Sequence, residues 1–184
     1  MAILSSGRAL LDASAVLRSA GLGSGMRFAD LGCGPLGHFV FPAAEIVGKE
    51  GRVYAVDILK SSLASVESRM RIEAYNNIST VWGDFERPNG VGIPAGSLHV
   101  LSIVNIIEVL IRAPKAFDEM KRLLVPEGRV LLVDWKRERT AIGPPIEHRV
   151  SREEAELAMT RAGFALKHAF DAGPYHWAQV FGRV

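Results

Sequence analysis

Short apolar runs alternate with segments of helical periodicity along this chain of 184 residues, and this alternation constrains the fold most. Strands are predicted at 27–31, 52–58, 77–82, 98–106, 129–135, 164–173 and 176–184, with a turn at 126–128 before the fifth. Helices are predicted at 39–48, 60–74, around 113–124 and 151–163. The pattern predicts an α/β protein with a parallel, doubly wound sheet and helices on both faces.

Length and composition indicate a single soluble domain. The chain is 48% hydrophobic and 23% charged, which is ordinary for a folded protein. Leu10, Ala13, Leu17 and Ala20 follow a helical spacing. We therefore expect one domain over 1–184, with an N-terminal helical segment at 1–21 and the α/β core at 22–184.

Several classes of protein are disfavoured by simple counts. The formal net charge of +2 is too small to indicate nucleic-acid binding by itself. A single cysteine, Cys33, excludes an internal disulfide framework. The N-terminus lacks the apolar stretch of a signal peptide, and the most apolar run, 100–111, is shorter than a membrane span. We expect a cytoplasmic protein without a membrane span.

The stretch FADLGCGPLGHFVF at 28–41 places a carboxylate directly before a glycine-rich turn. Its spacing Gly32-x-Gly34-x-x-Gly37 matches the dinucleotide fingerprint. Asp30, however, would lie near the pyrophosphate of a dinucleotide, at a cost of about 3 kcal/mol per like-charge contact at ~5 Å. S-adenosylmethionine carries a sulfonium and an α-ammonium, which a carboxylate attracts, and its α-carboxylate could use the free backbone N–H groups at the start of the following helix. The residues therefore favour S-adenosylmethionine, although a tight turn without any ligand is the simpler alternative.

Polar residues also close the next strands. Asp57 is placed to accept hydrogen bonds from both ribose hydroxyls of a nucleoside cofactor, or else to cap the following helix. Asp84 and its neighbouring backbone can read an adenine amino group, and Phe85 can cover the ring, unless this is a simple turn. Asn105 ends the fourth strand, where it could orient a substrate. The predicted cofactor site comprises Asp30, Gly32, Cys33, Gly34, Gly37, Asp57, Ile58, Gly83, Asp84, Phe85 and Asn105.

As a set, these strand ends resemble the class I S-adenosylmethionine-dependent methyltransferases. Asp30–Gly34 is similar to the family's glycine-rich first motif, Val56-Asp57 to its acidic second motif and Gly83-Asp84 to its third. The stretch 126–135 resembles the turn and fifth strand of the ubiquinone/menaquinone-biosynthesis-like (type 11/31-like) branch. The resemblance implies a Rossmann-like domain with seven strands, the last of them reversed, and methyltransferase activity. The third glycine departs from the common pattern, because Leu36 stands at its place and Gly37 follows.

No catalytic base is assigned from the sequence. A sulfonium is a good leaving group, so positioning can supply much of the catalysis, and a base is needed only for an acceptor that is protonated at the working pH. His38, His148 and His176 are candidates, but a surface or packing role is the commoner one for each. No cluster resembles a metal site. The charged stretch 136–139 is either a solvated loop or a clamp for an anionic acceptor.

The sequence does not identify the methyl acceptor. The signature of enzymes that methylate amino groups on nucleic acid or protein is absent, which favours a small molecule or quinone precursor. Only the N-terminal segment and 136–150 could form a lid. Two alternatives remain: an NAD(P)-dependent oxidoreductase, based on the literal glycine spacing, and a partner subunit that binds the cofactor without activity of its own.

Overall fold

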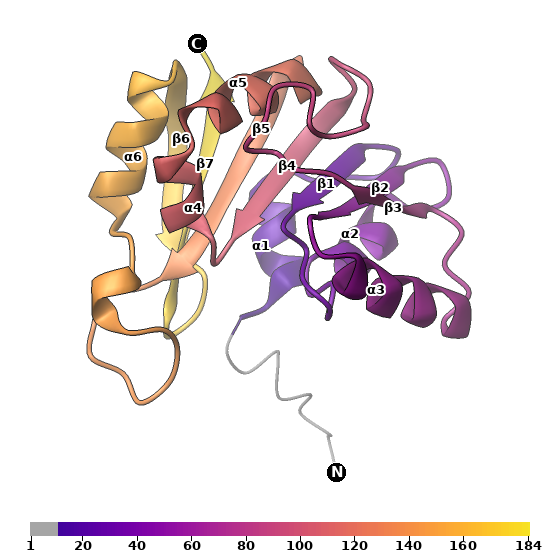
Figure 1. Ribbon diagram of the computed structural model, residues 1–184, viewed down its shortest axis with the longest axis horizontal. Helices are drawn as coiled ribbons and strands as arrows, with labels where there is room; N and C mark the ends of the chain where they lie inside the picture. Colours follow the sequence, from indigo (N-terminus) through magenta and orange to yellow (C-terminus); the bar gives the residue numbers. More distant parts are fainter. Residues whose placement is uncertain (1–10) are drawn as a thin grey trace.

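Seven strands form one sheet in the computed structural model, which describes residues 11–184. In chain order they are β1 (Arg27–Leu31), β2 (Arg52–Asp57), β3 (Ile78–Trp82), β4 (Leu98–Val104), β5 (Leu124–Trp135), β6 (Phe164–Asp171) and β7 (His176–Arg183). Across the sheet they are arranged β3-β2-β1-β4-β5-β7-β6, with β7 antiparallel to both of its neighbours and the pairs from β3 to β5 parallel (Figure 1). The predicted doubly wound, mostly parallel sheet with one reversed strand is confirmed.

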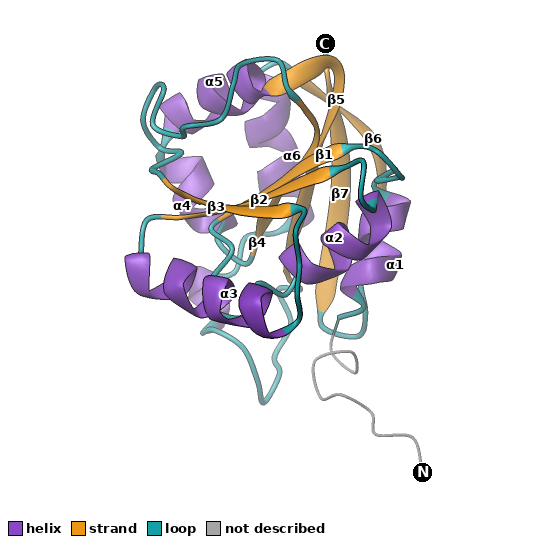
Figure 2. Ribbon diagram, turned by 90° about the vertical axis from the view of Figure 1, so that its right-hand side faces the viewer, coloured by secondary structure: helices purple, strands orange, loops and turns teal. Residues whose placement is uncertain are grey.

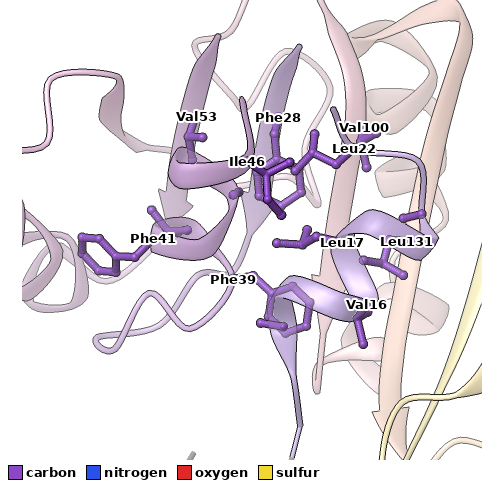
Figure 3. Packing of buried hydrophobic residues seen from close by; sticks show 14 of the residues in the cluster. Val16, Leu17, Leu22, Phe28, Phe39, Phe41, Ile46, Val53, Val100 and Leu131 are labelled. Atoms are coloured by element: carbon purple, nitrogen blue, oxygen red, sulfur yellow. The ribbon is translucent and has the colours of Figure 1, made fainter. Parts of the chain in front are cut away.

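Helices cover both faces of this sheet (Figure 2). On one face lie α1 (Ala13–Ser19), α2 (Val40–Val47) and α3 (Lys60–Ile72). On the other lie α4 (Ile107–Arg112), α5 (Pro114–Leu123) and α6 (Arg152–Arg161). The central strands are apolar on both sides, as strands between two helical layers should be, and two core clusters result. Figure 3 shows the first cluster, in which side chains of α1 and α2 gather against Phe28 and Leu131 of the sheet.

Two local predictions are wrong. The turn expected at 126–128 lies inside β5, which advances from Leu124 to Arg129 while β4 advances only from Leu98 to Val100. Residues 126–128 therefore form an irregular part of one long strand, and they do not separate a helix from a new strand. The fourth strand ends at Val104, and α4, which the sequence reading missed, begins at Ile107. A short 3₁₀ helix, Ile146–His148, interrupts the connection after β5.

The N-terminal helix is α1, which packs on α2 through the fully buried Leu17. Leu10, which was predicted on the same apolar face, lies outside the described residues. The division of the chain at residue 22 stays a prediction. Among residues 11–184, no helix combines the length and the apolar character needed to cross a membrane.

A capping box forms the start of α6. The Ser151 hydroxyl accepts a hydrogen bond from the Glu154 backbone N–H at 3.2 Å, and the Glu154 carboxylate accepts one from the Ser151 N–H at 2.8 Å. Two donors at the helix start are thereby satisfied.

Ser151→Ala should lower the free energy of unfolding by about 1 kcal/mol, because one helix N–H loses its acceptor. Urea denaturation followed by circular dichroism measures this loss. Ser61→Ala, at an exposed position inside α3, is the control and should change stability by less than about 0.5 kcal/mol. Equal stability of the two variants would show that the cap contributes nothing.

Candidate functional site

A cavity of about 370 Å³ opens at the carboxyl ends of the central parallel strands. The glycine turn after β1 forms one side, the end of β4 forms the floor, and the end of β5 with the start of β7 forms the far side. Five of the eleven predicted site residues line it: Asp30, Gly32, Cys33, Gly34 and Asn105. Its other lining residues are Leu11, Pro35, Leu36, His38, Phe39, Val104, Trp135 and His176.

Asp30 is a buried carboxylate at the inner wall of the cavity. It is 3% exposed, and its Oδ1 accepts a hydrogen bond from the Ser102 hydroxyl at 2.6 Å. The two residues are register partners across β1 and β4. Burial raises the pKa of Asp30 to about 7; the Ser102 bond opposes this rise, and the charge of Asp57 adds to it. A carboxylate this poorly solvated gains strongly from a cationic ligand, which is the role that the sequence predicts for it.

The glycine turn folds back over the end of β2. The N–H groups of Gly32 and Cys33 both donate to the Val56 carbonyl at 2.9 Å, and the Gly34 N–H donates to Asp57 Oδ2 at 2.9 Å. These three N–H groups therefore have partners within the protein, and the use of N–H groups at the start of the following helix by the α-carboxylate stays a prediction.

Two of the glycines serve different purposes. At Gly32, the backbone has φ +79°, which favours glycine, and a Cβ atom would lie 2.4 Å from the terminal Cδ1 of Ile106, a flexible side chain before α4. At Gly34, which has φ +62°, nothing lies within 4 Å of the place a Cβ would take. The backbone of Gly34 is thus open to a ligand in the cavity, and together with Asp30 it fits a cofactor with a cationic end.

Asp57 closes β2 and is 8% exposed. Besides the Gly34 N–H, it accepts the Leu59 N–H on Oδ1 at 2.8 Å, and Leu59 is the residue before α3. Both oxygens thus have one protein partner, and each keeps a second lone pair. The Leu59 bond reaches the residue before α3, and α3 itself has no side-chain cap hydrogen bond, so the capping alternative is not observed. The ribose role stays a prediction that the remaining lone pairs allow.

The end of β3 differs in detail from the expectation. Gly83 is needed for packing, since a Cβ there would lie 2.8 Å from the Gly90 carbonyl. Asp84 pairs with Arg87 at 2.9 Å. Phe85 is 8% exposed and belongs to the second core cluster, so its ring is largely unavailable to a ligand. The aromatic side chain that is open at this strand end is Trp82, 61% exposed, whose indole N–H donates to the Ile58 carbonyl at 2.9 Å.

Asn105 lies directly after β4 in a left-handed conformation, with φ +60°. Its N–H donates to the Val133 carbonyl at 2.8 Å, which fixes this conformation, and its exposed side chain lines the cavity. Asparagine tolerates a positive φ better than most residues, and such strain is concentrated at functional sites.

Cys33 is buried in the same turn. Burial raises the pKa of its thiol, and the nearby Asp30 and Asp57 raise it further, so the thiol stays neutral. Within residues 11–184, no three His, Cys, Asp or Glu side chains are grouped to hold a metal ion.

The far wall was not predicted as part of the site. Trp135 and His176 are register partners across the antiparallel β5–β7 pair, and their ring centroids lie 4.2 Å apart. His176 entered the sequence reading only as one of three possible bases, and Trp135 only as part of a motif. The signal available in the sequence was weak: a histidine at the start of an apolar strand.

The connection after β5 is held by one guanidinium. Arg149, 5% exposed, donates to the carbonyl oxygens of Pro144, Lys136, Glu138 and Ile142 and to the Thr140 hydroxyl, over 2.8–3.0 Å. Lys136 pairs with Asp171 at 2.8 Å and Arg137 with Glu154 at 3.5 Å. Neither lines the cavity, and the anion clamp at 136–139 stays a prediction.

A Rossmann-like sheet with one reversed strand and an acid–glycine turn at its central switch point defines the fold class of the S-adenosylmethionine-dependent methyltransferases. The family model described as "Methyltransferase domain" matches residues 22–178. The chain belongs to this family, and the predicted resemblance to its type 11/31-like members is confirmed.

Individual relatives agree with this assignment. The chain is 31% identical over 106 residues to nocamycin O-methyltransferase of Saccharothrix syringae, covering 58% of this chain and 36% of that protein. It is 26% identical over 114 residues to the human tRNA N(3)-cytidine methyltransferase METTL2B, covering 60% and 30%. The chain thus spans about a third of the length of these curated relatives. A SAM-dependent methyltransferase structure from Aquifex aeolicus shares its fold, with a TM-score of 0.90 at 24% identity over 98% of this chain and 94% of that one.

Proposed function

We propose that this chain binds S-adenosylmethionine along the ends of β1 to β3 and transfers its methyl group to a small, uncharged acceptor in the cavity. The observation that carries the proposal is the buried Asp30 carboxylate, which lies at the open glycine turn and faces a cavity without a lysine or arginine among its described lining residues. Asp30 would hold the cationic methionine end, Asp57 the ribose, and Ile58 with the Gly83-Asp84 backbone the adenine. Trp82 is added to this set as an exposed ring beside the adenine position.

The chemistry needs little from the protein beyond position. When bound, S-adenosylmethionine supplies an electrophilic methyl carbon on a sulfonium, which departs as a thioether when an acceptor lone pair attacks. The chain would orient the acceptor through the cavity wall beside Asn105 and keep the reacting groups away from water. The apolar lining supports a small organic acceptor over a nucleic acid or protein chain, although one relative is named for a tRNA substrate.

Isothermal titration calorimetry with S-adenosylhomocysteine tests the cofactor assignment. We expect saturable binding in the micromolar range, and the absence of heat at high micromolar ligand would contradict it. NADH fluorescence in a parallel titration tests the oxidoreductase alternative: saturation by NADH without any response to S-adenosylhomocysteine would favour that reading. Binding without transfer of a tritiated methyl group to any extract, restored by a co-purifying second chain, would instead favour a non-catalytic partner subunit.

A further inference from the structure

His176 is a buried residue of the cavity wall whose ring nitrogens lack hydrogen-bond partners within residues 11–184. His176 is the first residue of β7 and is 3% exposed, yet within residues 11–184 neither its Nδ1 nor its Nε2 has a hydrogen-bond partner. A buried polar group without a partner costs about 1–3 kcal/mol, and such groups are rare in folded proteins. Because His176 lines the cavity, a ligand there is the natural source of the missing partner.

The surrounding structure holds the imidazole ring in place. One side of the ring packs on Trp135 at 4.2 Å between centroids. Trp135 is itself supported by the Arg149 guanidinium, 5.5 Å from its ring centroid, and by Gly143, where a Cβ would lie 2.7 Å from the indole. His38, the other imidazole of the lining, is anchored through Nε2 to the Leu11 carbonyl at 3.3 Å. His176 is therefore the imidazole that the protein leaves free and orients.

The chemistry of the wall restricts what can bind. Burial, with smaller contributions from the charges of His38, Arg149 and Lys136, lowers the pKa of His176 to about 4, so the ring is neutral near pH 7. A neutral imidazole offers one N–H donor and one acceptor nitrogen. The rest of this wall is apolar and partly aromatic: Leu11, Phe39 and Trp135. A hydroxyl group on a flat, uncharged ring matches both properties, because it can donate to or accept from the imidazole. A carboxylate or phosphate would meet no cation among the described lining residues.

We propose that the acceptor is a planar aromatic or enolic hydroxyl compound, and that His176 is the hydrogen-bond partner that orients its hydroxyl for O-methylation. The hydroxyl oxygen would bond the methyl carbon as the carbon–sulfur bond breaks to leave S-adenosylhomocysteine, and the hydroxyl proton would pass to the acceptor nitrogen of His176 and then to solvent. The inference rests on the proposed function, because it places the acceptor in the same cavity as the methionine end of the cofactor. Asp30 and Asn105 lie on the β1 and β4 side of the cavity, and Trp135 and His176 on the β5 and β7 side. The two ligands would therefore lie side by side across the sheet edge.

Three matched probes test the proposed chemistry: 2-naphthol, naphthalene and 2-naphthoate, each titrated at pH 7 with and without S-adenosylhomocysteine and followed by amide NMR shifts. We expect 2-naphthol to bind at least several-fold more tightly than naphthalene and 2-naphthoate, with shifts centred on Trp135 and His176. His176→Phe keeps an aromatic ring against Trp135 and removes both nitrogens. It should weaken 2-naphthol about tenfold, to the level of naphthalene, while its melting temperature stays equal or rises.

Two further variants separate binding from packing. His176→Gln restores a donor and an acceptor and should keep 2-naphthol affinity within a few-fold of the wild type. His148→Phe, at an exposed histidine outside the cavity, should leave it unchanged. No binding of 2-naphthol at millimolar concentration, tighter binding of 2-naphthoate, or undiminished affinity in His176→Phe would each overturn the inference. Calorimetry with S-adenosylhomocysteine on the same samples shows separately whether the proposed cofactor function has failed.

Discussion

Asp57→Ala should weaken S-adenosylhomocysteine binding by about 1.5–3 kcal/mol, which corresponds to roughly a ten- to 150-fold rise in Kd. Two ribose hydroxyls would lose a charged acceptor. The same substitution also releases the Gly34 and Leu59 N–H groups that the carboxylate holds at 2.9 and 2.8 Å. The glycine turn would therefore be less well organised before the cofactor arrives. Calorimetry of the purified variant measures the change.

Asp84→Ala provides the matched control for Asp57→Ala. Asp84 also closes a strand, but it is more exposed, and its carboxylate pairs with Arg87 and with the Glu86 N–H. If its neighbouring backbone contacts the adenine, removing the side chain should raise Kd only a few-fold. Circular dichroism establishes that both variants are folded. A folded Asp57→Ala protein with wild-type affinity would refute the ribose assignment.

The second large effect concerns Asp30 and pH. Because burial raises the pKa of Asp30 to about 7, the free protein carries this carboxyl mostly protonated at pH 6 and mostly ionised at pH 8. A cationic ligand binds the ionised form and lowers its pKa. Affinity for S-adenosylmethionine should therefore rise with pH through 7, by as much as tenfold per unit below the pKa of the free protein. Calorimetric titrations from pH 6 to 8.5 measure the slope.

Asp30→Asn tests whether the charge of Asp30 causes this pH dependence of affinity. The amide keeps the size of the side chain and an oxygen for the Ser102 hydroxyl, but it carries no charge. At pH 8 it should weaken S-adenosylmethionine by about 1–3 kcal/mol, and at pH 6 by much less. The loss for S-adenosylhomocysteine should be similar or smaller, since the thioether keeps the α-ammonium. Titration of the ligand itself affects both proteins equally, so the difference between them reports on Asp30.

Ser102→Ala should shift the pH at which affinity for S-adenosylmethionine increases. The Ser102 hydrogen bond stabilises the ionised carboxylate, so its loss should raise the pH at which affinity increases. An identical pH profile in wild type and Asp30→Asn would contradict the proposed role of Asp30. Tighter NADH binding by Asp30→Asn, with no loss for S-adenosylmethionine, would instead favour a dinucleotide.

The sequence by itself determined the strands and most of the helices, and it placed several of the predicted cofactor residues at one edge of the sheet. Apolar runs that are buried on both faces, such as β4, can be recognised from the local sequence. The capping box at Ser151 is likewise a local pattern, and it sets the start of α6. In a doubly wound sheet the carboxyl ends of parallel strands meet at one edge, so Asp30 and Asp57 could be placed together from their positions alone. The short helix α4 and the irregularity in β5 left no comparable local pattern.

Only the tertiary structure decided what surrounds those residues. The register of β1 against β4 brings Ser102 to Asp30, and the register of β5 against β7 brings Trp135 to His176. Register between strands far apart in the chain is fixed by packing of the whole core, which a local pattern does not encode. Tertiary structure likewise assigned the N–H groups of the glycine turn to Val56 and Asp57 and left the nitrogens of His176 unpartnered within the described chain. Whether a buried polar atom is satisfied depends on every neighbour at once, and for that reason the wall formed by Trp135 and His176 became visible only in three dimensions.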